Sequence, residues 1–476
     1  MGRTRKGGAV RTTVKAGGKE ARAQLPLLLA CSFAASFAQS MMNIALPQVA
    51  DEFGVTLSTA NWLVTGYMVV AATSIALAAF LLRRLGLRTV FLIGCGALAL
   101  GSGLALLAPD FWVLLAGRLV QAVCTGLFYP AVTSFIMANS DPARRGTHLA
   151  MNSGTVAAGL AVSPVASGLV LTGLGRHALF ALPLALAVLL LAVGFFRLRE
   201  VGPRGAGAVD PLSVVLGLVG LGALVYGLGE VFRDPLPSLA VLAAGVAVLG
   251  LFAWRQLALK DPLLNLRPLG NPGFAVGELL VMLGMMASFS LSILLPLYYE
   301  GALGFSPFLA GTLLAGPVLA NALSDVVGGR LLDRRGIWPL VPFGFALTAL
   351  GLAGVALAAG RPLLALVVLA SAVAYVGLGL VVAPSKTTAL VQLPSSLYAH
   401  ASSINSAFIE IASAIGSSLF VGVLSADVLA GTSRGLARAA AYDEGFAHTM
   451  EIAIGIAVAS LLVSLVYAYR LRRRKG

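Results

Sequence analysis

The sequence predicts an all-α polytopic membrane protein, and three observations carry that prediction. The chain has 476 residues, of which 58% are hydrophobic and only 11% charged, with a mean hydropathy of +0.93. Soluble domains are usually about 25% charged, so lipid is the solvent that suits this composition. Long apolar runs also recur along the chain, and Lys and Arg gather in every second connection between them.

Each expected element is an apolar run of about 20 residues, because every backbone amide of a spanning helix needs a partner within its own segment. Fourteen such runs are found, at 25–47, 60–82, 89–108, 111–138, 148–172, 178–196, 211–229, 237–254, 273–297, 307–329, 338–358, 363–384, 402–425 and 449–469. The stretch 426–448 is expected to be the longest connection on its side of the membrane.

The positions of the positive charges predict which ends of these spans face the cytoplasm. Of the 33 Lys and Arg residues, 27 fall in the two tails and in alternate connections, so both termini are expected in the cytoplasm of a bacterial inner membrane. The net charge of +14 is then explained by topology and by contact with anionic lipid, and nucleic-acid binding is not expected. The three cysteines lie within apolar runs without a CxxC pair, so no metal or cofactor is expected.

An internal repeat divides the chain. AFLLRRLG at 79–86 follows the second span and GRLLDRRG at 329–336 follows the tenth, an offset of 250 residues. Secondary transporters are often built from such related halves. We expect these units: a basic tail at 1–24, a six-helix bundle at 25–200, a linker with two extra spans at 201–262, a second six-helix bundle at 263–470 and a basic tail at 471–476.

Several motifs resemble one transporter family. The G-x-L-x-D-R-x-G pattern at 329–336, MNIALPQVADEFGV at 42–55, NWLVTGYMV at 61–69, GRLVQA at 117–122 and GLAVSPVASG at 159–168 are similar to motifs of the major facilitator superfamily. Within it they resemble the fourteen-span drug:proton antiporter branch, with its tetracycline and multidrug exporters. The resemblance implies two six-helix bundles with two additional central helices and a substrate site between the bundles.

The sequence departs from that branch at sites that matter for coupling. Ala38 stands where the branch usually has an acidic residue in the first span, and Arg83 replaces the aspartate of the first signature loop. Ala122, Ser163 and Ser167 replace glycines of the fourth- and fifth-span motifs. Proton coupling and the gating contacts of the first half therefore need testing.

Ionisable residues within spans tend to face a cavity or a partner, since burying them in lipid is costly. Glu410 is the deepest carboxyl group and is expected to carry the transported proton; its alternative role is helix packing. It lies on one helical face with a polar stripe, Ser403, Ser406, Ser413 and Ser417. Arg118, with Gln121 one turn away, is linked with proton transfer in the resembled family and is otherwise a hydrogen-bond hub.

Three further polar side chains within spans are candidates for the proton or substrate site. Asp325 and Glu278 lie nearer the cytoplasm and could instead pair with loop arginines, while Asn43 could bond either substrate or a neighbouring helix. A second set is expected to serve gating or close helix packing: Gly86, Asp333, Arg334, Gly336, Gly159, Ser163, Pro164 and Ser167.

The sequence supports a monomeric secondary transporter that exports amphipathic, often cationic, drug-like molecules by proton antiport and alternating access. An uncoupled or differently coupled facilitator of lipid- or peptide-like substrates is the alternative, motivated by Ala38 and Arg83. A membrane-embedded enzyme is a remote third possibility, because the four histidines are scattered and no P-loop is found.

Overall fold

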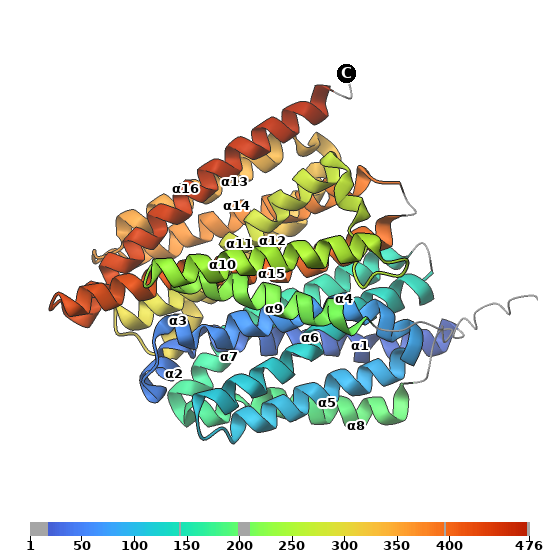
Figure 1. Ribbon diagram of the computed structural model, residues 1–476, viewed down its shortest axis with the longest axis horizontal. Helices are drawn as coiled ribbons and strands as arrows, with labels where there is room; N and C mark the ends of the chain where they lie inside the picture. Colours follow the sequence, from blue (N-terminus) through green and yellow to red (C-terminus); the bar gives the residue numbers. More distant parts are fainter. Residues whose placement is uncertain (1–17, 142–143, 199–209, 395–396, 474–476) are drawn as a thin grey trace, which may run out of the picture.

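A computed structural model describes residues 18–141, 144–198, 210–394 and 397–473 (Figure 1), and all regular structure within these residues is helical. The elements are α1 Gly18–Ser40, the 3₁₀ turn η1 Met41–Asn43, α2 Leu46–Phe53, α3 Leu57–Ala60, α4 Trp62–Leu85, α5 Leu87–Leu106, α6 Phe111–Asn139, α7 Arg145–Leu179, α8 Ala181–Arg197, α9 Pro211–Glu230, α10 Pro235–Ala258, the 3₁₀ turn η3 Arg267–Gly270, α11 Pro272–Gly301, α12 Pro307–Arg335, α13 Ile337–Ala358, α14 Leu364–Val391, α15 Tyr398–Ser433 and α16 Arg438–Arg473.

The predicted all-α membrane fold is confirmed. Thirteen helices of the described residues are long and apolar enough to cross a membrane, and the shorter apolar helix α8 accounts for the fourteenth predicted span. Most of residues 1–24, the linker residues 199–209 and the end of the tail at 471–476 lie outside the described residues, so the expectations for them stay predictions.

The helices pack in two groups, here called the N-terminal half (α1–α8) and the C-terminal half (α11–α16). The two halves meet chiefly where α7 packs against α12 and where α4 packs against α15. The hairpin of α9 and α10 lies against α15 and α4 (Figure 1), so it touches both halves. The exact domain boundaries proposed from the repeat remain a prediction.

Two stretches differ from the expected elements. The first span does not continue as one helix to residue 47, because α1 ends at Ser40 and gives way to η1. The expected long connection at 426–448 was wrong, since α15 runs to Ser433 and α16 begins at Arg438. The alanine-rich sequence on both sides favours helix beyond the apolar run, and Gly435, with φ of 85°, lies in the short break between them.

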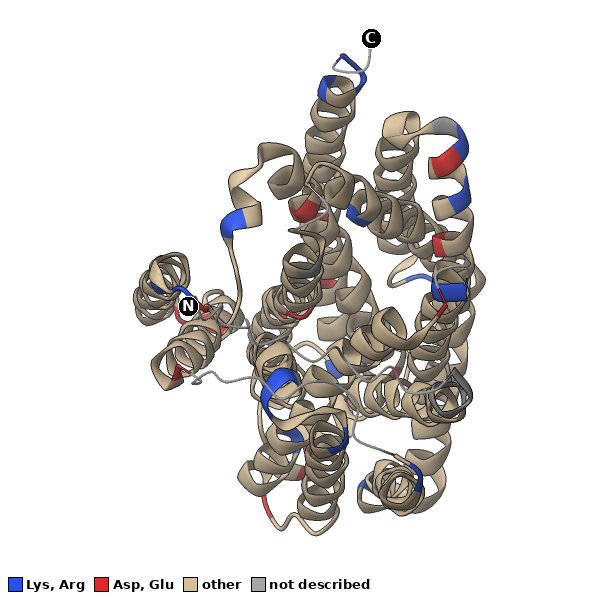
Figure 2. Ribbon diagram, turned by 90° about the vertical axis from the view of Figure 1, so that its right-hand side faces the viewer, with Lys and Arg blue, Asp and Glu red and all other residues tan. Residues whose placement is uncertain are grey.

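One end of the helix bundle is strongly basic, and we call it the basic end. Arginines lie in the last or first turns of the helices there, at Arg83, Arg84, Arg88, Arg255, Arg330, Arg334, Arg470, Arg472 and Arg473. Figure 2 views the molecule from this side, with Lys and Arg in blue. The arrangement matches the charge asymmetry that oriented the predicted spans.

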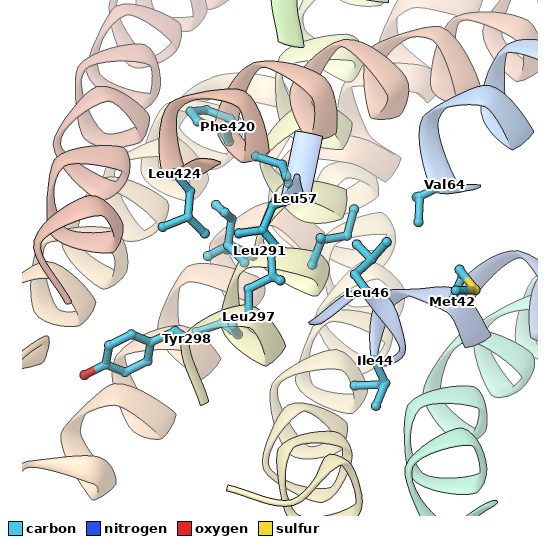
Figure 3. Close-up of a cluster of buried hydrophobic side chains, with 14 of the residues drawn as sticks. Met42, Ile44, Leu46, Leu57, Val64, Leu291, Leu297, Tyr298, Phe420 and Leu424 are labelled. Atoms are coloured by element: carbon cyan, nitrogen blue, oxygen red, sulfur yellow. The ribbon is translucent and has the colours of Figure 1, made fainter. Parts of the chain in front are cut away.

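The two halves are joined at the opposite end by a buried apolar cluster (Figure 3). Met42, Ile44, Leu46, Leu57 and Val64 come from the N-terminal half, and Leu291, Leu297, Tyr298, Phe420 and Leu424 from the C-terminal half. We call this set the interface cluster. Asp51 Oδ1 also accepts a hydrogen bond from Arg438 Nη2 at 2.8 Å, which is an ion pair between the halves. The halves are therefore closed against each other at this end.

The α9–α10 hairpin is fastened at the same end. Ser58 Oγ donates to Glu230 Oε1 at 2.7 Å, and Ser418 Oγ donates to the Val225 carbonyl at 2.5 Å. A Cβ atom on Gly422 would lie 2.5 Å from the carbonyl oxygen of Gly229, so only glycine allows α9 to approach α15 this closely. The hairpin thus bonds to the N-terminal half through Ser58 and to the C-terminal half through α15.

Candidate functional site

A completely buried arginine donates hydrogen bonds to the carbonyls at the C-terminal end of α1. Where α1 changes to η1, its last carbonyls lack helical partners. Arg118, on α6, donates from Nη1 to the Ala38 carbonyl at 2.8 Å and from Nη2 to the Gln39 carbonyl at 3.4 Å. Its Nε donates to the Leu63 carbonyl at 3.1 Å, and its guanidinium carbon lies 4.3 Å from the ring centroid of Tyr67. Arg118 therefore joins α1, α4 and α6 into one unit.

Gln121 extends this unit to α5. Its Oε1 accepts from Arg118 Nη1 at 2.9 Å, and its Nε2 donates to Ser102 Oγ at 2.7 Å. The approach of α5 to α6 requires small residues, because a Cβ atom on Gly101 would lie 2.6 Å from the backbone nitrogen of Gln121. Gln121, which the sequence places one turn from Arg118, is thus bonded to it, and Arg118 also makes the backbone contacts of a hydrogen-bond hub.

Glu410 is buried where the two halves meet. Only 3% of the residue is exposed, and its Oε2 accepts from Gln39 Nε2 at 2.9 Å across 371 residues of sequence. Gln39 Oε1 in turn accepts from the Tyr129 hydroxyl at 3.3 Å. No ion pair to Glu410 is found within the described residues. The deepest carboxyl group of the C-terminal half is therefore bonded to an amide of the N-terminal half.

The serines of the polar stripe around Glu410 differ in their hydrogen-bond partners along α15. Ser406 and Ser413 donate to carbonyls of their own helix, at Ser402 and Ile409. Ser417 instead donates to Asn61 Oδ1 at 3.0 Å, which is a second polar contact between the halves. Ser403 lies nearest the basic end and is half-buried.

A small central pocket of about 60 Å³ lies between the halves. It is lined by Ser40, Leu160, Pro164, Ser288, Phe289, Ser292, Leu314, Val318, Asn321 and Tyr375, none of which is charged. Next to it, Asn43 Nδ2 donates to Ser292 Oγ at 3.0 Å, while Asn43 Oδ1 is buried without a partner among the described residues. Asn43 therefore both bridges the halves and keeps one free acceptor.

The remaining acidic candidates lie within the C-terminal half, nearer the basic end. Glu278 Oε1 accepts from Asn405 Nδ2 at 2.7 Å, and only 1% of Glu278 is exposed. Asp325 lies one turn from Asn321, and its Oδ1 is buried without a hydrogen-bond partner among the described residues. Lys386, on α14, interacts electrostatically with both carboxyl groups. These groups are separate from the Arg118 unit.

The small-residue motif lets α7 pack closely against α1 of its own half and against α12 of the C-terminal half. A Cβ atom on Gly159 would lie 2.8 Å from the Phe33 carbonyl oxygen, and Ser163 Oγ donates to the Phe37 carbonyl at 2.8 Å. On the other side, the carbonyl oxygen of Pro164 lies 2.3 Å from where a Cβ of Gly311 would be. Ser167 is buried, and its Oγ has no partner among the described residues.

The two signature loops form matching turns at the basic end. Gly86 and Gly336 have φ of 81° and 71°, a backbone region that favours glycine, and each separates two long helices. Asp333 and Arg334 are exposed beside Gly336. A latch role for these residues stays a prediction.

Three polar residues that join the halves or support a carboxyl group were missed by sequence reasoning: Gln39, Asn61 and Asn405. Each is uncharged and lies in or next to an apolar run, where asparagine and glutamine give little signal alone. For Gln39 a signal existed, because it follows Ala38, the position where an acidic residue is expected from the resemblance.

Comparison with known proteins identifies a family across most of the chain. The family model described as the Major Facilitator Superfamily matches residues 28–417. The lincomycin resistance protein LmrB of Bacillus subtilis (strain 168) is 30% identical over 457 residues, covering 94% of this chain and 95% of that protein. The methylenomycin A resistance protein of Streptomyces coelicolor is 28% identical over 425 residues, covering 87% and 89%.

Solved structures agree at the level of the fold. The POT family transporter PepTSo superposes with a TM-score of 0.67 at 16% identity, over 95% of this chain and 98% of that chain. A bacterial homologue of the human lysosomal transporter Spinster gives a TM-score of 0.68 at 14% identity, over 95% and 98%.

Proposed function

The chain belongs to the major facilitator superfamily, whose members are transporters rather than enzymes, and from this premise we propose that it exports amphipathic, drug-like small molecules in exchange for protons. The exporter works as a monomer by alternating access in a bacterial inner membrane. Its basic end, with both termini, faces the cytoplasm, as the positive-inside rule predicts.

The substrate class is supported by the relatives and by the central pocket. Two relatives are named for resistance to antibiotics, lincomycin and methylenomycin A. The central pocket offers serine hydroxyls, the Asn321 amide and apolar walls. Such a lining suits molecules that combine apolar surface with a few hydrogen-bonding groups. A positive charge on the substrate would be balanced by Glu410 rather than by the pocket.

The observation that carries proton coupling is the hydrogen bond from Gln39 to Glu410. A hydrogen bond to an ionised carboxylate is roughly twice as strong as one between neutral groups. Protonation of Glu410 therefore weakens a contact that joins the halves, and loss of the proton strengthens it. A change in proton occupancy is in this way converted into a change in the affinity of the halves for each other.

Arg118 supports this step as a positioning residue. It bonds the backbone carbonyls of Ala38 and Gln39, and so fixes the segment that carries the Gln39 amide. The closed interface cluster and the Asp51–Arg438 ion pair are consistent with a state that is shut at the end opposite the basic end. In our proposal this is the state that receives substrate from the cytoplasm.

One observation favours an uncoupled facilitator as the second candidate. Ala38 has no carboxyl group at the position where the resembled branch usually has one, and its carbonyl accepts from Arg118 instead. An exporter with this segment would then move substrate down its gradient without a proton.

The experiment is substrate transport in proteoliposomes that contain a pH-sensitive dye. The purified protein is challenged with a lincosamide, a tetracycline and a lipophilic cation, and compared with Glu410→Gln. The matched control is Glu451→Gln, which makes the same change on the exposed side of α16. We expect substrate-dependent proton movement in the wild type and the control, and none in Glu410→Gln.

Two outcomes would contradict the proposal. Substrate flux without any pH change in the wild type would replace antiport by the facilitator. Proton movement that persists in Glu410→Gln would keep antiport but exclude Glu410 as its carrier, and Asp325→Asn would be measured next.

A further inference from the structure

A second, larger cavity of about 640 Å³ lies at the basic end, away from the central pocket. It is formed where α12, α13, α14 and α16 end or begin. Its lining consists of Leu332, Asp333, Gly336, Ile337, Trp338, Thr387, Thr388, Val391, Gln392, Ala468, Leu471 and Arg472. We call it the inner-rim pocket. None of the residues to which a transport role is proposed above lines it, apart from Asp333 and Gly336 of the signature loop.

The inner-rim pocket is amphipathic. One part is apolar, with Trp338, Val391 and Leu471, and Val391 is left 67% exposed. The other part is polar, with the hydroxyls of Thr387 and Thr388 and the Arg472 guanidinium. An apolar surface beside a cation fits a ligand that has both a hydrocarbon portion and an anionic group.

The surrounding charge is positive. Arg470 and Arg473 share the last turn of α16 with Arg472, and Arg334 lies beside the pocket on α12. Asp333 is the one carboxylate in the lining. Basic pockets between spanning helices at the cytoplasmic surface bind anionic lipid headgroups. The inner-rim pocket also lies at the depth of lipid headgroups, because Trp338 and the arginines mark the boundary between membrane and water.

The related half of the chain is filled at the corresponding place. The loop after α12 matches the loop after α4 at the 250-residue offset, and α8 matches α16 as the last long helix of its half. There Leu198, only 2% exposed, packs in one apolar cluster with Leu85 and Phe135. Arg88 caps this packing by donating to the Phe195 carbonyl at 3.1 Å and lying over the Phe195 ring. Among the described residues, this place in the N-terminal half is therefore packed with side chains, whereas its counterpart in the C-terminal half is open.

We propose that the inner-rim pocket binds one anionic phospholipid of the membrane leaflet at the basic end. The phosphate pairs with Arg472, and an acyl chain covers Trp338, Val391 and Leu471. Asp333 accepts a hydrogen bond from a hydroxyl of the headgroup, which favours phosphatidylglycerol over lipids without such a donor. This lipid joins the end of α16 to the signature loop between α12 and α13.

The test is lipid retention by the full-length protein, measured by native mass spectrometry after titration with phosphatidylglycerol or phosphatidylcholine. Arg472→Gln removes the proposed phosphate partner, and Val391→Trp fills the apolar part. Arg470→Gln is the matched control, because it removes the same charge from the same helix end outside the pocket lining. Melting temperatures of all three variants exclude misfolding as the cause.

We expect one phosphatidylglycerol to be retained by the wild type and by Arg470→Gln. Its affinity should fall about tenfold or more in Arg472→Gln, as expected for a lost charge-assisted hydrogen bond, and retention should be lost in Val391→Trp. Equal retention of phosphatidylcholine, or equal loss in the two arginine variants, would overturn a specific site. Displacement of the lipid by inorganic phosphate alone would show a site for free anions instead. Transport is not the readout, so this result is independent of the proposed export.

Discussion

The two halves of the molecule treat their buried charges in opposite ways. In the N-terminal half, the guanidinium of Arg118 is surrounded by three backbone carbonyls, an amide oxygen and the Tyr67 ring. In the C-terminal half, Glu410 and Glu278 each have one amide partner, and Asp325 has a buried oxygen without one. A permanently charged group that donates from all three of its nitrogens suits a fixed frame, whereas sparsely bonded carboxyl groups can gain and lose protons.

Substitution of Arg118 should have the largest effect, because the buried charge of the N-terminal half is expected to hold that half together. Arg118→Met removes the side-chain donor of the Ala38 and Gln39 carbonyls at the end of α1, at about 1–3 kcal/mol for each. We expect a large loss of folded protein, measured by the temperature at which the detergent-solubilised protein leaves its monomer peak. Arg361→Met, an exposed arginine, is the control. Wild-type stability of Arg118→Met would mean that the N-terminal half does not depend on this frame.

The second test concerns Glu410, for which we expect a larger effect on transport than on stability. Glu410→Gln should instead remove the pH dependence of transport and lower the accumulated substrate ratio by about 5–150-fold, the usual range of a coupling free energy. The measurement is initial transport rate against pH in proteoliposomes. A rate profile that keeps its wild-type pH dependence would count against a titrating role for Glu410.

A double-mutant cycle measures the coupling free energy of the contact between the halves. Gln39→Ala and Glu410→Gln should be non-additive by about 1.5–3 kcal/mol, since the bond is made to a charged group. The pair Asn43→Ala and Ser292→Ala is neutral and should couple by only about 0.5–1.5 kcal/mol. Thermal denaturation at neutral pH gives both values, and equal coupling in the two pairs would argue that Glu410 is already protonated.

Two neighbouring acids on α2 allow the finest comparison, since Asp51 pairs across the halves and Glu52 pairs within one. Glu52 accepts from Arg176 Nε at 2.8 Å, and that guanidinium lowers the pKa of the Glu52 carboxyl. A lowered pKa means that the pair contributes stability at neutral pH and loses it as the pH falls through the folded-state pKa. Glu52→Gln should therefore flatten the acid side of the stability curve.

Asp51→Asn removes an exposed ion pair that is worth at most about 1 kcal/mol. Because Asp51 pairs with Arg438 across the halves, its loss should favour opening at that end. Ser425 Oγ accepts a hydrogen bond from the Ser58 backbone nitrogen at that end, so the accessibility of the thiol in Ser425→Cys measures the opening. The same accessibility change in Glu52→Gln would show that the two acids are not distinct in role.

The fold could be predicted because the lengths of the apolar runs and the positions of the arginines can be read from the sequence alone. The sequence also made Glu410 and Arg118 candidates, since ionisable residues stand out within apolar runs, and their functional roles stay predictions. The partners of these residues were not predictable, because one sequence does not say which helix faces which. The contact of Gln39 with Glu410 joins residues 371 positions apart, and the carbonyls at the break of α1 are bonded by Arg118 from another helix.

That break has a consequence for biogenesis. Arg118 leaves the ribosome 79 and 80 residues after Gln39 and Ala38, whose carbonyls it will bond. Until α6 is inserted, the end of α1 carries backbone groups that a lipid environment cannot satisfy. The first segment must therefore wait beside the insertion machinery or in the headgroup region for the fourth span. In this protein the membrane integration of the first helix is completed by a helix made well after it.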